Sequence, residues 1–354
     1  MKPYIQAFIC LFLWSFKIYS APALRKILAT QDISIEKKDR AIFFIKKLQS
    51  TQLTAASTTS RRVEKKTVIP EAVLKSALQN LYAHPEAKFS RRDQLQAGET
   101  NKTFTFYGAS VAFRQKNLKT KIKLRARFYL KIDKNGNTLR SQPGHGFLEL
   151  KIKNPLPGQR GVHKYRIKLR DDLIFQVFTN PAYTDEFQLA LQNIKESLSP
   201  SSKEYQTALI MLEATEYFSN IDSRFSQPVL GVSYTRDSYQ QDILSHNVQI
   251  TLDRNVQAYL PYQINHLNTF DDYLFEEAAK DLTHTYPSDI VVLELKEPMQ
   301  ISLKKTFKKD SLLERLRLFR QHAFCRAYVS SGFDIERNRG KAGTIRNLLY
   351  EKYL

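Results

Sequence analysis

The chain has 354 residues, of which 42% are hydrophobic and 12% aromatic, and this composition is typical of a globular protein with one large core or two smaller ones. It carries 55 lysines and arginines against 35 aspartates and glutamates, which gives a net charge of +20 at pH 7. Composition therefore argues against a disordered chain and points to polyanionic partners: nucleic acid, acidic lipid or condensed phosphates.

Residues 1–20 have the pattern of a secretory signal peptide, because Lys2 precedes an apolar run over residues 5–16 and a small residue, Ala21, follows. The run is shorter than the roughly 20 residues that span a bilayer. We therefore predict a secreted or periplasmic protein with no transmembrane segment after cleavage. Lys17, a charge late in the signal, leaves an alternative in which the uncleaved segment anchors the protein to the membrane.

Residues 21–60 are predicted to contain an amphipathic helix, IEKKDRAIFFIKKLQS, and a Ser/Thr-rich linker, TQLTAASTTS. The segment RVEKKTVI then alternates charged and apolar residues as a strand does. PEAVLKSALQNLYAH predicts a helix that starts at Pro70, since proline is tolerated in a first helical turn. FTFYGASVAF predicts a strand with a break at Gly108.

Three central segments, IKLRARFYL, GFLELKIK and KYRIKLR, alternate charged and apolar residues, so that strands would separate them onto two faces. The charged positions are Lys121, Lys123, Arg125, Arg127, Glu149, Lys151, Lys153, Lys164, Arg166, Lys168 and Arg170. Three neighbouring strands would then share one cationic face, and such a face requires an anionic guest. The alternative is a solvated basic sheet face, since edge strands often carry lysine for solubility.

The second half of the chain returns from helices to strands. DEFQLALQNIKESL and SKEYQTALIMLEATEYF predict helices separated by SPSS, and DSLLERLRLFRQHAF predicts a last helix. Between them, GVSYTRDSY places Tyr234 and Arg236 on one strand face, NVQITLD places Gln249 with Asp253, and IVVLELKE carries Glu294 and Lys296.

About eight strands of this kind predict an α+β fold in which an antiparallel sheet closes into a barrel, because closure removes unprotected edges. The charged faces would line the inside. Carboxylates must then offset the cations, since unpaired charge away from water is costly. Residues distributed as such offsets are Glu64, Glu149, Asp253 and Glu294.

The order of motifs resembles the VTC domain, the polyphosphate-polymerase domain of vacuolar transporter chaperone proteins, in the triphosphate tunnel metalloenzyme (CYTH-like) group. The motifs are RVEKK, KLRARFYL, GFLELKIK with HKYRIK, VSYTR, VQITLD, VVLELK and FCRAY, over residues 61–332, which leaves residues 333–354 as a basic tail. The resemblance implies a closed tunnel barrel with helices outside and transfer of the terminal phosphoryl group of ATP onto polyphosphate.

The resemblance also implies which residues act. Those matching phosphate-holding cations of the family are Lys66, Arg125, Arg127, Lys151, Lys164, Arg166 and Arg236, and we take them as the candidate catalytic set. Candidate substrate-binding residues are Lys123, Tyr234, Lys296 and Arg326. Glu294 matches a ligand of a divalent metal, Mn or Mg, and Glu149 and Glu64 are further candidates. ATP or linear polyphosphate is the expected partner.

Several candidates have a second interpretation. Glu294 is either the metal ligand or a salt-bridge partner of Lys296, and Glu149 is either a ligand or an ion-pair partner of a lysine on the same face. Arg326 either binds substrate or solvates the end of the last helix. We expect no nucleic acid partner, because no zinc finger, basic zipper or RNA-recognition motif is present.

Three positions depart from the family. Cys325-Arg326 replaces a Ser-Lys pair, Gln249 stands where arginine is usual, and FTFYGASVAF lacks an aspartate often found there. An exported protein would also meet little ATP. The sequence therefore supports two functions: a metal-dependent polyphosphate polymerase or phosphohydrolase, and a catalytically inactive polyphosphate-binding protein. It leaves the oligomeric state open.

Overall fold

The computed structural model describes most of the chain between residues 62 and 325. Outside the described part are residues 93–98, 155–161, 171–188, 260–283 and 302–307, together with shorter gaps. Beyond this region it places three short strands: β1 (Gln31–Asp32), β14 (Val329–Ser330) and β15 (Phe333–Asp334). The predicted signal peptide, the helix at residues 35–50, the Ser/Thr-rich linker and the tail beyond residue 334 lie outside the described residues.

One large antiparallel sheet forms the centre of the fold. Its long strands are β2 (Arg62–Pro70), β4 (Thr100–Gly108), β6 (Leu118–Ile132), β8 (His145–Lys153), β9 (Val162–Arg170), β10 (Pro228–Ile243), β11 (His246–Tyr259) and β13 (Ile290–Pro298). They pair in the order β9-β8-β6-β4-β10-β11-β13-β2. Shorter strands join its margins: β3 (Ser90–Arg91), β5 (Val111–Gln115), β7 (Thr138–Leu139) and β12 (His284–Thr285).

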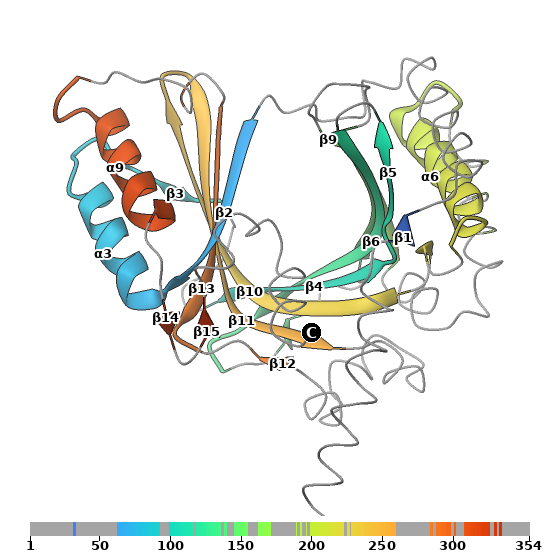
Figure 1. The fold of residues 1–354 in the computed structure, drawn as a ribbon, viewed down its shortest axis with the longest axis horizontal. Helices are drawn as coiled ribbons and strands as arrows, with labels where there is room; N and C mark the ends of the chain where they lie inside the picture. Colours follow the sequence, from blue (N-terminus) through green and yellow to red (C-terminus); the bar gives the residue numbers. More distant parts are fainter. Residues whose placement is uncertain are drawn as a thin grey trace, which may run out of the picture.

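The prediction of a closed barrel is wrong. In the described part of the chain β2 and β9 are the two ends of the sheet, and no ladder joins them. The sheet is instead strongly bent, with β2 in one arm and β9 in the other (Figure 1). Closure requires the end strands to approach to about 4.8 Å in register. Alternation of charged and apolar residues is the same in an open and a closed sheet, so it did not decide between them.

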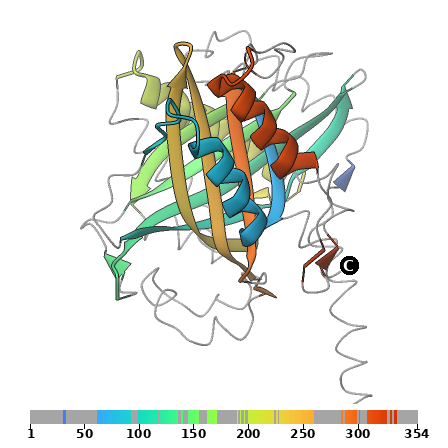
Figure 2. The same cartoon turned by 90° about the vertical axis from the view of Figure 1, so that its left-hand side faces the viewer.

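Two helices cover the outer face of one arm. α3 (Glu71–Tyr82) follows Pro70 directly, and α9 (Leu312–Cys325) lies beside it across the strands (Figure 2). Both bury residues at helical spacing against the sheet, namely Leu74, Ala77 and Leu81 from α3 and Leu316, Phe319 and Ala323 from α9. This packing confirms the two helices predicted at these positions.

The other arm carries α6 (Lys203–Ser219) on its outer side (Figure 1). The side chain of Ser202 caps this helix by accepting a hydrogen bond from the backbone N–H of Tyr205 at 3.1 Å. Ala208, Met211 and Phe218 are buried. The helix predicted just before it, at residues 185–198, lies almost entirely outside the described residues. No helix in the described part of the chain combines the length and apolar character needed to span a bilayer.

A buried ion pair fixes α9 to the sheet. Arg320 donates from Nη1 to both carboxylate oxygens of Glu297 on β13, at 3.0 and 3.2 Å. Arg320 is 7% exposed and Glu297 is fully buried. Removal of one partner would leave the other charge buried and unpaired, which is costly.

We therefore expect Arg320→Ala to lower the free energy of unfolding by about 3 to 5 kcal/mol, as measured by urea denaturation. The double variant Arg320→Leu with Glu297→Leu should recover most of this loss, since neither charge remains. Arg317→Ala, on the exposed side of α9, serves as the control. Equal stability of Arg320→Ala and the control would show that the pair does not hold the helix.

Candidate functional site

The register of the strands gathers the predicted cations on one face of the sheet. Lys123, Lys151 and Lys164 form a row across β6, β8 and β9. The alternating residues on the opposite side of these strands are buried: Ile122, Leu124, Ala126, Leu148, Leu150, Ile152, Tyr165 and Ile167. The predicted separation into an apolar and a cationic side is therefore confirmed. We call the side without helices, which is the inner side of the bend in Figure 1, the cationic face.

Glu149 lies at the centre of one half of the cationic face and is completely buried. Its carboxylate accepts from Arg125 Nε at 2.5 Å and from Arg166 Nε at 2.7 Å, and it pairs with Lys164 Nζ at 2.6 Å. Arg127 Nη1 is 3.9 Å away. The structure thus gives Glu149 the ion-pair role that the sequence left open beside the metal-ligand role.

These cations govern the ionisation of Glu149. Burial alone raises the pKa of a carboxyl group, but Arg125, Arg127 and the two cations of β9 lower it, and the net pKa lies well below the ordinary value of 4.5. Glu149 is therefore a fixed negative charge at every physiological pH, and it orients the groups around it.

Tyr129 belongs to the same half of the face, and the sequence analysis missed it. Its phenol oxygen accepts from Arg127 Nη1 at 3.4 Å and from Arg166 Nη2 at 3.2 Å. Burial raises the pKa of Tyr129, but Arg127 and Arg166 lower it, with a net downward shift. The sequence pattern could have indicated Tyr129, because it is the next residue on the face that begins with Lys121 and continues to Arg127.

A second cluster lies on β2 and β13. Glu294 is 3% exposed and pairs with Lys66 at 2.9 Å and with Lys296 at 2.9 Å. Glu64 pairs with the same Lys66 at 3.4 Å. Burial raises the pKa of Glu294, but the two lysines lower it, so that the pKa lies well below its ordinary value. The salt bridge to Lys296 that the sequence analysis weighed is present.

Arg236 and Tyr234 on β10 lie between the two clusters. Arg236 donates from Nε and Nη2 to the two carboxylate oxygens of Asp253 at 2.6 and 2.7 Å, and its guanidinium lies 4.8 Å from the centre of the Tyr234 ring. Asp253 is buried. With Glu149 and Glu294, it confirms the prediction that carboxylates offset the cations of this face.

Lys151 lies between Lys123 and Lys164 in the row of the cationic face. Burial lowers its pKa most; Glu64 raises it, while Arg125 and Lys66 lower it, and the net shift is downward. Among the described residues no carboxylate lies within ion-pair distance of Lys151. Burial likewise lowers the pKa of Lys164 to about 8.

The carboxylates differ in how well they fit a metal ion. Glu149 does not fit, because four cations surround it. Glu294 and Glu64 fit a Mg²⁺ or Mn²⁺ ion only if phosphate oxygens and water provide the other ligands, which is how Mg²⁺ usually binds at nucleotide sites. The described residues contain no group of three or more Asp, Glu, His or Cys side chains arranged for metal binding.

Gln249 and Arg326 are two further positions singled out from the sequence. Gln249 is on the cationic face of β11 opposite Lys296, and its side chain accepts from Arg92 Nη1 at 3.5 Å. Arg326 lies outside the described residues, so its assignment as a substrate-binding residue stays a prediction.

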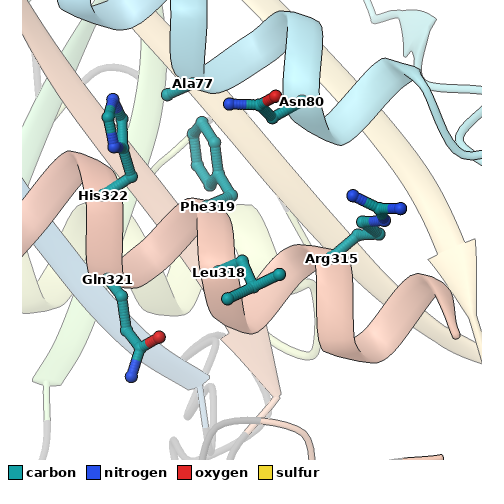
Figure 3. A pocket seen from close by; sticks show the side chains of 7 residues that line it. All are labelled: Ala77, Asn80, Arg315, Leu318, Phe319, Gln321 and His322. Carbon is teal, nitrogen blue, oxygen red and sulfur yellow. The ribbon is translucent and has the colours of Figure 1, made fainter. Parts of the chain in front are cut away.

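A groove of about 460 Å³ lies away from the cationic face, on the outside between α3 and α9. Figure 3 shows Ala77 and Asn80 from α3 and Arg315, Phe319 and His322 from α9 around it. None of the described residues that line it carries a carboxylate, and Arg315 is the one arginine or lysine among them. The chemistry of the site therefore belongs to the cationic face.

Comparison with protein families matches the chain to the VTC domain over residues 62–324. The match covers most of the chain and nearly the whole sheet with α3, α6 and α9, and the chain therefore belongs to the VTC domain family. None of the curated proteins searched is significantly similar to it. The membership confirms the family expected from the motifs and supports a polyphosphate-polymerase-like function in general terms.

The charge of Glu149 gives a pH prediction. Because its folded pKa is depressed, its stabilising effect is present above the unfolded value of 4.5 and is lost as the pH falls toward the folded pKa. We expect Glu149→Gln to be less stable than the wild type at pH 7, with a difference that narrows steadily below pH 4.5 in urea unfolding. Glu204→Gln, a change at an exposed carboxylate of α6, is the control. A constant difference between pH 7 and 3 would contradict this account.

Proposed function

We propose that the protein binds the phosphate groups of ATP and of linear polyphosphate along the cationic face and, with a divalent metal ion, transfers the terminal phosphoryl group of ATP to a growing polyphosphate chain. The observation that carries this proposal is the collection of cations from β2, β6, β8, β9, β10 and β13 on one face of a VTC domain, around buried carboxylates. Phosphoryl transfer depends mainly on positioning and on neutralising charge, and such a face provides both.

The balance of charge supports an anionic guest of high charge density. Cations on this face include Lys66, Lys123, Arg125, Arg127, Lys151, Lys164, Arg166, Arg236 and Lys296, and carboxylates on it include Glu64, Glu149, Asp253 and Glu294. The excess of positive charge requires an anion for neutrality. A narrow phosphate chain can follow a bent sheet face, whereas a nucleic acid duplex is much wider.

Arg125 illustrates how the face is prepared for phosphate. It uses Nε to hold Glu149, and its two Nη groups donate to no residue in the described part of the chain. A guanidinium fixed in this way presents a fork of donors that matches two phosphate oxygens. Glu149 thus acts as a positioning residue, and Arg125 with Lys151 would contact the phosphates.

The second cluster is where we place the reacting end of the chain. Glu294 and Glu64 would hold a divalent ion there, and the chemistry that such an ion would supply is neutralisation of the phosphate charge. Lys66 and Lys296, which pair with Glu294, would hold the same phosphate group from either side. No group of the protein needs to form a covalent bond in this reaction.

A specific observation favours the second candidate function, a polyphosphate-binding protein without turnover. Gln249 is neutral at a position where the family resemblance implies arginine, and Cys325-Arg326 replaces a Ser-Lys pair. Gln249, opposite Lys296, removes a charge that the resemblance implies beside the proposed reacting end, while the cluster around Glu149 is intact. The same experiment separates the two functions.

The test is incubation of the chain from Ala21 to Leu354 with ATP and Mn²⁺, followed by gel analysis for polyphosphate and an assay of released phosphate. We expect a polyphosphate ladder from the wild type. Glu294→Gln should reduce turnover at least a hundredfold while it still binds polyphosphate, because metal and charge stabilisation act in the transition state. Glu204→Gln is the matched control. A wild type that shows no product but melts at a higher temperature with polyphosphate would be the non-catalytic binder.

A second prediction concerns pH. Protonated Lys164 favours anion binding, and it loses its proton as the pH rises through about 8, so affinity for long-chain polyphosphate should be constant near pH 6 to 7 and fall above pH 8. Lys164→Arg should remove this component, since arginine stays charged. Titration calorimetry at pH 6.5, 7.5 and 9 would measure it. Identical pH profiles for the two proteins would rule out Lys164 as the titrating group.

A further inference from the structure

Two neighbouring arginines, Arg91 at the end of β3 and Arg92 directly after it, lie on opposite sides of the sheet. Arg91 is opposite Tyr239 of β10 in the register, and the backbone N–H of Arg92 donates to Ser238 O at 2.8 Å. The side chain of Arg91 pairs with Asp237 at 2.7 Å, and Asp237 also accepts from Arg254 at 2.6 Å on the outer side. Arg92 is an exposed residue in a bend, and its contact with Gln249 places its guanidinium on the cationic face.

The guanidinium of Arg92 is held there by a neutral partner. Its Nη1 donates to Gln249 Oε1 at 3.5 Å. Gln249 is 9% exposed, and its own Nε2 donates to Asn247 Oδ1 at 2.6 Å, which turns the carbonyl oxygen toward Arg92. Among the described residues, no carboxylate lies within ion-pair distance of Arg92. Its charge is therefore oriented but not neutralised, in contrast to Arg236 with Asp253.

The position of Arg92 relates it to the second cluster. Gln249 is directly opposite Lys296 in the pairing of β11 with β13. Lys296 in turn lies 2.9 Å from Glu294. The guanidinium of Arg92 thus sits across one strand from the lysine and carboxylate at which we place the reacting phosphates.

We propose that Arg92, the residue directly after β3, binds phosphate: its guanidinium, which donates to Gln249, contacts a phosphate group of a linear triphosphate or polyphosphate beside Lys296. This inference rests on the function proposed above. It extends the site to a segment that enters the sheet margin between α3 and β4, outside the strands whose alternating charges define the rest of the face.

The test is titration calorimetry of inorganic tripolyphosphate into the chain from Ala21 to Leu354 and two single variants. Arg92→Gln should weaken binding by about tenfold or more, because a charge-assisted hydrogen bond is lost. Arg91→Gln is the matched control: it removes the same charge from the adjacent residue on the other face, and affinity should stay within about twofold. Arg92→Lys should restore part of the affinity, since it keeps the charge and loses the fork.

The outcomes separate this inference from the proposed function. Wild-type binding with unchanged affinity in Arg92→Gln would overturn the role of Arg92 and leave the proposed function standing. Equal losses in Arg92→Gln and Arg91→Gln would also overturn it, because the effect would then be general to net charge. A wild type that binds neither tripolyphosphate nor long-chain polyphosphate would overturn both. Melting curves without ligand would check that each variant is folded.

Discussion

The cationic face depends on the burial of negative charge beneath it. Four cations from β6 and β9 could not lie within a few ångströms of one another unless Glu149 were ionised between them. Asp253 likewise supplies the negative charge beside Arg236, and Glu294 supplies it beside Lys66 and Lys296. These carboxylates fix the cations in position before any ligand arrives, so that a phosphate chain would meet an arranged set of donors.

The two sides of the sheet have different roles: the outer side stabilises the fold, and the inner side carries the proposed binding site. The outer side is apolar and is covered by α3 and α9 at one arm, where Arg320 and Glu297 add a buried ion pair. The inner side, the cationic face, carries the charged residues. In the described part of the chain the two end strands, β2 and β9, are not hydrogen-bonded to each other, so the sheet is bent but open (Figure 1).

An open sheet also gives neighbouring segments access to the inner side. Arg92, which directly follows the short strand β3, donates to Gln249, so this neutral residue on β11 has a cation beside it. A departure from a family pattern at one strand position can therefore be offset by a residue from elsewhere in the chain. A comparison of motifs one strand at a time does not reveal a residue from another segment that supplies the missing charge.

The sequence by itself determined the strands, most of the helices and the faces, because side chains alternate with a period of two and Lys121 to Arg127 could only share one side. Tyr129 followed from the same rule and was overlooked. The tertiary structure alone decided that the sheet stays open, since alternation does not fix the distance between end strands. It also decided that Glu149 pairs with Arg125 and Arg166 and that Arg92 contacts Gln249, because each contact joins segments that are separated along the chain.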